Sequence, residues 1–217
     1  MSYRFVFCHG WGFDYKFFQP LINEYFSQVP YHCLDLGYFG EENLDLPEDS
    51  TFIGIGHSLG LIKLASLNVK FNGLIGVQAF VNFLGFDLQL HKKRKLELKT
   101  MIQHFQMDPV DTLISFHKRC GVNYNSFNCL NKAKLMQDLE LLTMVHQLPH
   151  TPLLILGAMN DAIVPQELIY DNFNKDVKVA MHSRSYHSLG LCERHFVYEQ
   201  IISFCNGITK EIHTEQF

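Results

Sequence analysis

Short apolar runs alternate along this chain with longer stretches in which apolar residues return every three or four positions. The runs predict about six strands, near residues 4–8, 32–35, 51–55, 73–77, 153–156 and 177–181. The stretches between them mostly have the period of amphipathic helices. Strands that alternate with helices are typical of a parallel sheet covered by helices, so the pattern predicts an α/β fold with a mostly parallel sheet. A chain of 217 residues suits one such domain with a sizeable core.

The segment 84–147 lacks this alternation, because it shows helical periodicity and no convincing strand. The apolar positions that define its expected helical faces are Met101, Phe105, Leu113, Phe116, Leu135, Leu139, Leu142 and Val145. We therefore divide the chain into a core, made of residues 1–83 and 148–217, and a helical insertion of residues 84–147.

The pentapeptide Gly56-His57-Ser58-Leu59-Gly60 lies between the predicted strand at 51–55 and a helical pattern. In serine hydrolases, a Gly-x-Ser-x-Gly sequence on a strand–turn–helix forms the nucleophile elbow, a tight turn that exposes the serine Oγ. The helix that follows turns backbone N–H groups toward the reacting carbonyl. Ser58 is therefore the candidate nucleophile.

A second motif, His9-Gly10-Trp11-Gly12, follows the first predicted strand. Acyl-transfer enzymes need two backbone N–H groups aimed at the developing oxyanion. In this architecture one belongs to the residue after the nucleophile and one to a His-Gly loop. We place them on Leu59 and Trp11. The alternative is that the two glycines only close a turn before a helix that begins near Tyr15.

The candidate acid and base follow the last two strands. Asp161 comes after the strand at 153–156, and His187 lies in the loop beyond the strand at 177–181. The chain order Ser58, Asp161, His187 is that of the α/β-hydrolase arrangement, in which the aspartate orients the histidine.

Each assignment has alternatives, since the chain contains 12 histidines. His182 and His195 are alternative bases, and Asp87 is an alternative acid. We interpret Asp14, Asp35 and Asp111 as helix-capping or turn residues.

The whole chain resembles the α/β-hydrolase carboxylesterases. It is most similar to the esterases that cleave pimeloyl-[acyl-carrier protein] methyl ester in biotin synthesis. The resemblance is carried by the His9–Gly12 motif, Leu34-Asp35-Leu36-Gly37-Tyr38-Phe39-Gly40, the elbow, Asp161-Ala162-Ile163-Val164-Pro165 and His187. Lyases and carbon–carbon-bond hydrolases of the same superfamily share the first two motifs. The resemblance implies the same catalytic and oxyanion residues as the motifs do.

The chain departs from that family at three places, one of which is Leu61, after the elbow, where a second small residue is common. The first predicted strand begins almost at residue 1, where family members usually have two earlier antiparallel strands, and residues 41–49 form an acidic loop where they usually have a helix. We therefore expect a trimmed α/β-hydrolase fold.

The resemblance also implies that the insertion forms a helical cap, which excludes water and shapes the acyl pocket. Aromatic residues near strand ends are the candidate substrate-binding residues: Trp11, Phe13, Phe80, Phe83 and Phe86. The insertion carries basic residues, namely Lys92, Lys93, Arg94, Lys118 and Arg119. Such a rim would dock an acidic acyl carrier protein, as the resembled esterases do; a solvated helical face is the alternative interpretation.

Composition and charge limit the kinds of molecule that this chain is expected to bind. A formal net charge of −4 and a pI near 6.3 argue against nucleic acid. The sequence shows no signal peptide and no apolar run of membrane-spanning length. The six cysteines lack metal-site spacing. We expect a cytoplasmic monomer with free thiols, no membrane partner and no metal or other cofactor.

The predicted reaction is hydrolysis of a carboxylic ester through an acyl-enzyme, with methanol as the leaving alcohol if the biotin-type substrate is the natural one. Three alternatives stay open: a general small-ester esterase, a lyase of the menaquinone-synthesis type on the same fold, and a non-catalytic ligand-binding module.

Overall fold

The computed structural model describes residues 3–47, 50–124, 127 and 129–214, with the backbone alone from residue 210 onward. Within this part of the chain, six strands form one sheet in the order β2-β1-β3-β4-β5-β6, and every neighbouring pair is parallel. The strands are β1 (Arg4–Cys8), β2 (Tyr31–Leu34), β3 (Phe52–His57), β4 (Phe71–Val77), β5 (Leu153–Ala158) and β6 (Lys178–His182). Each lies within two or three residues of its predicted position, and the predicted α/β class is confirmed.

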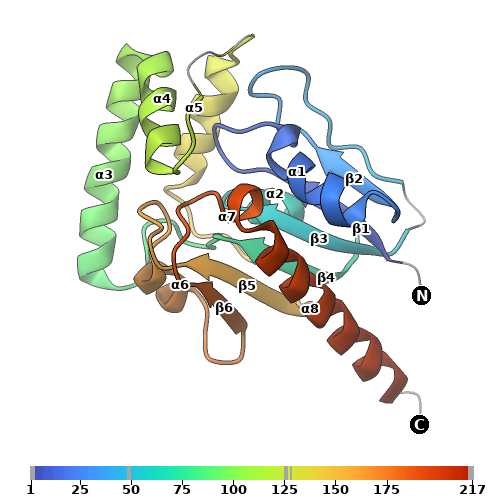
Figure 1. The fold of residues 1–217 in the computed structure, drawn as a ribbon. Coiled ribbons are helices and arrows are strands. Elements are labelled where there is room, and N and C mark those ends of the chain that lie inside the picture. The colour runs from blue at the N-terminus through green and yellow to red at the C-terminus, as the bar shows by residue number, and fades with distance from the viewer. Residues whose placement is uncertain (1–2, 48–49, 125–126, 128, 215–217) are drawn as a thin grey trace.

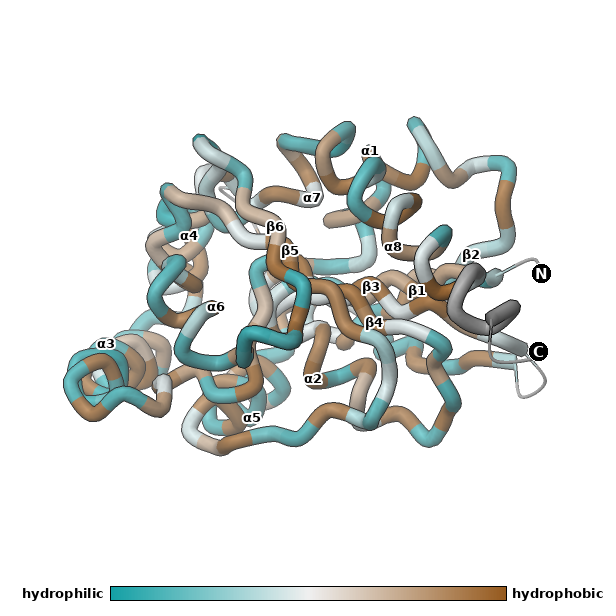
Figure 2. Tube along the Cα trace, turned by 90° about the horizontal axis from the view of Figure 1, so that it is seen from below, coloured by the Kyte–Doolittle hydropathy of each residue, from teal (hydrophilic) through white to brown (hydrophobic). Residues whose placement is uncertain are grey.

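Helices cover both faces of the sheet (Figure 1). Seen along the sheet in Figure 2, α1 (Gln19–Leu21), α7 (Leu189–Cys192) and α8 (Arg194–Thr214) lie on one side, and α2 (Gly60–Ala65) lies on the other. The 3-10 turn η1 (Tyr15–Phe18) leads into α1, and the π-helical turn η2 (Ile22–Phe26) follows it. Helix α6 (Gln166–Asn172) connects β5 to β6. The central strand β3 is buried along its whole length, as a parallel strand covered on both faces must be.

The segment between β4 and β5 folds into three helices: α3 (Leu88–Met107), α4 (Pro109–Arg119) and α5 (Lys132–Leu141). They stand beyond the carboxyl ends of the strands (Figure 1). Local sequence sets their boundaries. Asp108 accepts hydrogen bonds from two backbone N–H groups of the first turn of α4, and Pro109 occupies the first helical position, so α3 ends and α4 begins there.

Local structure differs from the expected one at one of two positions. The described part of the acidic loop, residues 41–47, contains no helix, as predicted, and Asn43 pairs with Asp35 in an isolated bridge. The prediction that Val145 lies on the same helical face as Leu135, Leu139 and Leu142 was wrong. Helix α5 ends at Leu141, so Val145 lies beyond it, is 59% exposed and pairs with Asn82. Leu135 and Leu139 are buried on α5 as expected.

Candidate active site

The serine lies on a sharp turn between β3 and α2. Ser58 has φ of 53°, a left-handed conformation that non-glycine residues adopt rarely and mostly at functional sites. Its backbone N–H donates to the Val77 carbonyl at 2.9 Å, which ties the turn to the end of β4. A Cβ on Gly60 would come within 2.3 Å of the Cys8 carbonyl oxygen, so only glycine lets α2 cross β1 this closely. This is the geometry expected of a nucleophile elbow.

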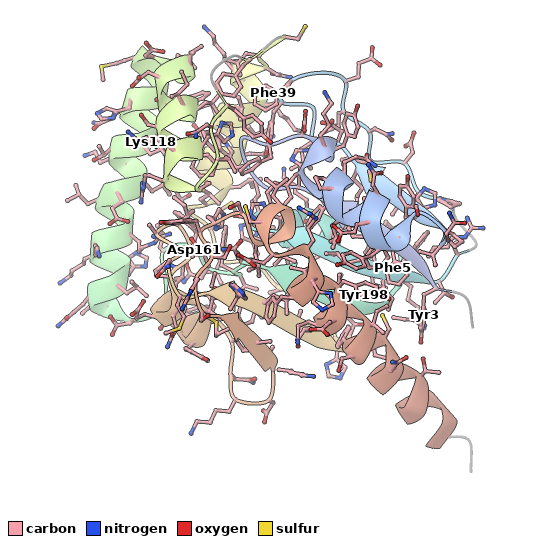
Figure 3. All side chains as sticks on the ribbon, viewed as in Figure 1. Tyr3, Phe5, Phe39, Lys118, Asp161 and Tyr198 are labelled. Carbon is pink, nitrogen blue, oxygen red and sulfur yellow. The ribbon has the colours of Figure 1, made fainter. Side chains whose placement is uncertain are left out.

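Asp161 and His187 are in contact, as the chain order predicts. The His187 Nδ1 and an Asp161 carboxylate oxygen, Oδ2, are 2.7 Å apart, and both side chains are fully buried. The other oxygen accepts from the backbone N–H groups of Ile163 and Val164, each at 2.8 Å. Figure 3 shows Asp161 at the carboxyl end of β5. The loop that follows β5 therefore folds around its own aspartate and points one oxygen at the histidine.

The second nitrogen of His187 is available for chemistry. Its Nε2 is buried and has no hydrogen-bond partner among the described residues. The ring lies beside the elbow, since its centroid is 4.7 Å from that of His57, the residue before the serine. Burial lowers the pKa of His57 well below its usual value, so the imidazole nearest to His187 is neutral at pH 7. The structure thus places His187 in contact with Asp161 and beside the turn that carries Ser58.

The two residues proposed to supply the oxyanion amides, Trp11 and Leu59, lie next to or within the elbow. Gly10 packs directly on the elbow, because a Cβ at this residue would come within 2.9 Å of the Ser58 Cβ. Neither the Trp11 N–H nor the Leu59 N–H donates to an acceptor in the described part of the chain. Buried N–H groups are nearly always paired, so unpaired amides beside a nucleophile point to a ligand oxygen that they would bind.

The loop His9–Gly12, which is proposed to supply one oxyanion amide and is called the oxyanion loop below, is held from the insertion as well as from the core. The Trp11 indole Nε1 donates to the Leu135 carbonyl of α5 at 2.8 Å. On α4, His117 donates from Nε2 to the Gly12 carbonyl at 2.6 Å. Burial lowers the pKa of His117 to about 4, so it is a neutral donor at pH 7. The position of the loop therefore depends on α4 and α5.

A cavity of about 40 Å³ opens onto the serine between the sheet and the insertion. Ser58 and Leu59 line it, and most of its other lining residues are apolar, including Trp11, Phe80, Phe83, Met101, Phe116 and Leu139. Three of the five predicted substrate-binding residues, Trp11, Phe80 and Phe83, therefore line this cavity.

The other two aromatic candidates, Phe13 and Phe86, do not line this cavity. Phe86 is 55% exposed. Its backbone N–H donates a hydrogen bond to the Asp171 carboxylate just before α3, and its side chain points toward solvent. Phe13 is buried, but it packs against Phe17, His57 and His117 and faces a different cavity beside Asp14 and Tyr124. Both were chosen for closeness to a strand end, which does not fix the direction of a side chain.

One of the five predicted docking residues was also wrong. Arg94 is only 3% exposed and lies in the cavity wall. It donates to the carbonyls of Phe83 and Ile163, at 3.2 and 2.7 Å, and its guanidinium stacks on the Phe83 ring at 4.1 Å. Its role is to bind α3 to the loop that carries Asp161. Lys92, Lys93, Lys118 and Arg119 are exposed.

The alternative acid and bases occupy other places. Asp87 caps α3 by accepting from the N–H groups of Gln89 and Leu90. His182 lies on β6 and faces Glu193 at 3.5 Å, and His195 is exposed on α8. Asp14 caps η1 and Asp35 closes a turn with Gly37, as interpreted, whereas α4 is capped by Asp108 with Asp111 in its first turn.

One residue of the site was missed by sequence reasoning. Gln78 follows β4, is fully buried, and donates from Nε2 to Asp161 Oδ2 at 2.6 Å. A glutamine directly after a buried apolar strand was the signal that could have drawn attention to it.

In the described ranges, no three His, Cys, Asp or Glu side chains gather closely enough to hold a metal ion. None of the helices among those residues has the length and apolar character needed to cross a bilayer.

The sheet, the elbow and the order of the edge residues define an α/β-hydrolase fold. No protein-family model and no curated protein matches this sequence. Solved structures match over nearly the full chain. An esterase from Exiguobacterium antarcticum has a TM-score of 0.72 at 15% identity, with 93% of this chain and 91% of that chain covered. A thermophilic esterase from Thermogutta terrifontis has a TM-score of 0.69 at 12% identity, with 96% and 91% covered.

A structure titled MenH from S. aureus shares the fold too, with a TM-score of 0.63 at 15% identity and coverage of 96% and 95%. At such low identity these similarities show the fold alone. Esterases are frequent among the neighbours, yet the fold serves other proteins as well, so the chemistry of this chain must be argued from its own site.

Proposed function

We propose that this chain is a serine hydrolase that cleaves carboxylic esters through an acyl-enzyme. The observation that carries the proposal is the buried Asp161–His187 hydrogen bond beside a strained serine, with two unpaired backbone amides next to it. Such an arrangement activates a hydroxyl, receives its proton and stabilises an oxyanion, which are the three requirements of acyl transfer.

In the proposed mechanism, His187 Nε2 takes the proton from Ser58 Oγ while Oγ attacks the ester carbonyl carbon. The N–H groups of Trp11 and Leu59 bind the oxyanion; loss of one such donor costs about 100- to 1,000-fold in a comparable enzyme. His187 then gives its proton to the leaving alkoxide, and an alcohol departs. Water repeats the same steps on the acyl-enzyme and releases the carboxylic acid. Asp161 stays ionised and orients the imidazole.

We propose that the insertion, residues 84–147, acts as a cap over this chemistry. Its helices supply Met101, Phe116 and Leu139 to the cavity wall, and they hold the oxyanion loop through Leu135 and His117. A mostly apolar wall favours an acyl chain, because burial of apolar surface is worth roughly 25 cal/mol per Å².

For the natural substrate we propose pimeloyl-[acyl-carrier protein] methyl ester, with methanol as the first product. Two features support it besides the sequence resemblance. A groove of about 390 Å³ between α3 and α4 adjoins the serine cavity, because Glu97, Met101, Phe116 and Arg119 line both. We propose that a long acyl chain extends from the cavity into this groove. Lys92 and Lys93 on α3 and Lys118 on α4 are exposed on the two helices that form this groove, and their positive charge suits an acidic carrier protein.

The test compares hydrolysis of p-nitrophenyl acetate, butyrate and octanoate with methyl release from the carrier-bound ester, using wild type and Ser58→Ala. We expect Ser58-dependent cleavage of all four, fastest for the carrier-bound ester. Cleavage of the p-nitrophenyl esters alone would support the esterase and reject the biotin-type substrate. Absence of Ser58-dependent cleavage of every ester would reject the proposal.

The docking surface has its own control. In Lys92→Glu/Lys93→Glu/Lys118→Glu, we expect KM for the carrier-bound ester to rise about 10-fold at low salt, while p-nitrophenyl butyrate is cleaved as before. Lys175→Glu, at an exposed position before β6, should change neither. Equal effects of the triple and the control variant would argue against a docking role.

A further inference from the structure

The end of β4 has the same unusual backbone as the elbow. Besides Ser58, the described residues include only two other non-glycine positions with positive φ, Gln78 and Cys129. Gln78 has φ of 53°, equal to that of Ser58 at the end of the neighbouring strand β3, and its N–H donates to the Leu156 carbonyl of β5. Unfavourable backbone conformations persist where the surroundings hold them in place and gather at active sites.

The side chain of Gln78 joins the acid loop to the base loop. Its Nε2 donates to Asp161 Oδ2 at 2.6 Å and to the Tyr186 carbonyl at 2.7 Å, and its Oε1 accepts from the Leu189 N–H at 2.8 Å. Only this orientation of the amide satisfies two acceptors and one donor, so the neighbours fix it. Tyr186 and Leu189 lie on either side of His187, so one buried amide holds the ends of the histidine loop and the carboxylate.

The contact with Asp161 falls on the catalytically relevant oxygen. Oδ2 is the atom that also bonds to His187 Nδ1, whereas Oδ1 is occupied by two backbone N–H groups. Among the residues that the structure describes, the carboxylate therefore has four donors and no fixed cation as a hydrogen-bond partner. A neutral amide can orient Oδ2 without cancelling its charge, so the charge is left to stabilise the imidazolium that forms during the reaction.

We propose that Gln78 is a positioning residue for this reaction: it sets the relative placement of Asp161 and the His187 loop. The inference rests on the proposed serine-esterase function. Gln78 lines no part of the serine cavity, so its substitution should lower kcat and leave KM nearly unchanged.

The test uses two variants of similar size, Gln78→Met and Gln78→Glu, with p-nitrophenyl butyrate as substrate. Methionine keeps the volume but has no donor. We expect kcat at pH 8 to fall about 10- to 100-fold in both, as for loss of a hydrogen bond to a charged group, with KM within about 3-fold of wild type. The matched controls Gln137→Met and Gln137→Glu, at an exposed position on α5, should match wild type.

The pH dependence separates positioning from mere packing. An ionised glutamate cannot donate to Asp161, but a protonated one can. The kcat ratio of Gln78→Glu to wild type should therefore rise from pH 8 to pH 5.5, while the ratio for Gln78→Met stays flat. Circular dichroism identifies a misfolded variant. If Gln78→Met does not fold, the pH dependence of the kcat ratio of Gln78→Glu to wild type is the test of the inference.

Two results would overturn the inference while the proposed function stands: a kcat within about 3-fold of wild type in a folded Gln78→Met, or a glutamate ratio that does not change with pH. If wild type itself shows no Ser58-dependent hydrolysis, the proposed function has failed instead, and the two failures are told apart by the Ser58→Ala control.

Discussion

Two regions of this molecule each contain a buried carboxylate, and their partners differ. One lies between the insertion and α2, the helix that follows Ser58. There, Asp138 of α5 accepts hydrogen bonds from Lys63 of α2 at 2.5 Å and from the Tyr38 hydroxyl at 2.6 Å. Burial, with Asp138 next in importance, raises the pKa of Tyr38 well above its usual value, so the hydroxyl remains a donor. At the sheet edge, Asp161 bonds instead to a histidine, an amide and backbone N–H groups.

The difference lies in what balances the negative charge. Asp138 has a permanent cation, Lys63, so its charge is neutralised in the resting protein and its bonds tie α5 to α2. Asp161 has a partner that becomes a cation only when His187 receives a proton. We infer that the first carboxylate serves structure and the second serves chemistry, and substitutions at each should affect different measurements.

The largest expected effect is that of Asp161→Asn on kcat. The isosteric amide fits the same loop but no longer holds the required histidine tautomer, so kcat for p-nitrophenyl butyrate should fall about 10⁴-fold, as in a comparable triad. Steady-state kinetics with a urea-unfolding control measures this. A drop smaller than about 10-fold would mean that Asp161 is not the acid.

At the other carboxylate, Asp138→Asn should act on stability. It leaves Lys63 and Tyr38 without their anionic partner, and loss of one member of a buried pair costs about 3–5 kcal/mol. Because the Lys63 side chain is 17% exposed and can reach water, we expect about 3 kcal/mol from urea unfolding. The kcat of the folded variant should stay within a few-fold of wild type. A 10⁴-fold loss of kcat would show that Asp138, like Asp161, is needed for the reaction.

The link between the insertion and the oxyanion loop should respond to pH through His117. Its folded pKa of about 4 lies below the unfolded value near 6.5, so the unfolded chain binds a proton in this window that the folded chain does not. Stability should therefore fall by about 3 kcal/mol as pH drops from 6.5 to 4.

His117→Gln keeps a donor for the Gly12 carbonyl but removes this titration. Its unfolding free energy, measured in urea at pH 7 and pH 5, should fall less between the two values than that of wild type. Identical pH dependence in both proteins would show that His117 is not responsible.

The smallest effect concerns a single hydrogen bond across the same link. Trp11→Phe removes the indole donor to the Leu135 carbonyl and keeps the backbone N–H that we assign to the oxyanion. Unfolding free energy should decrease by about 1 kcal/mol, with kcat within about 3-fold of wild type. A loss of kcat larger than 100-fold would mean that the indole positions the loop far more strongly than one hydrogen bond allows.

Much of this arrangement could be predicted from the sequence, because it depends on local pattern. The strands follow from apolar runs, and Ser58, Asp161 and His187 follow from their places after strands, where parallel topology brings loops to one edge. The pair Asp161–His187 is 26 residues apart in the chain and in contact in the structure, as predicted.

The errors concern side-chain direction, which depends on long-range packing. Arg94 and Phe86 belong to segments whose average character is basic or aromatic, yet the first is buried against Phe83 and the second is exposed. Gln78 was missed because its importance arises only when two distant loops meet around it. Likewise, no sequence pattern pairs Lys63 with Asp138, 75 residues away.

The central claim is that Ser58 is a nucleophile activated by His187, and mass spectrometry after treatment with a fluorophosphonate tests it most directly. We predict one covalent adduct on wild type, mapped by peptide sequencing to Ser58, with no adduct on Ser58→Ala and greatly slowed labelling of Asp161→Asn. An adduct that maps to another residue, or equal labelling of Ser58→Ala, would contradict the account.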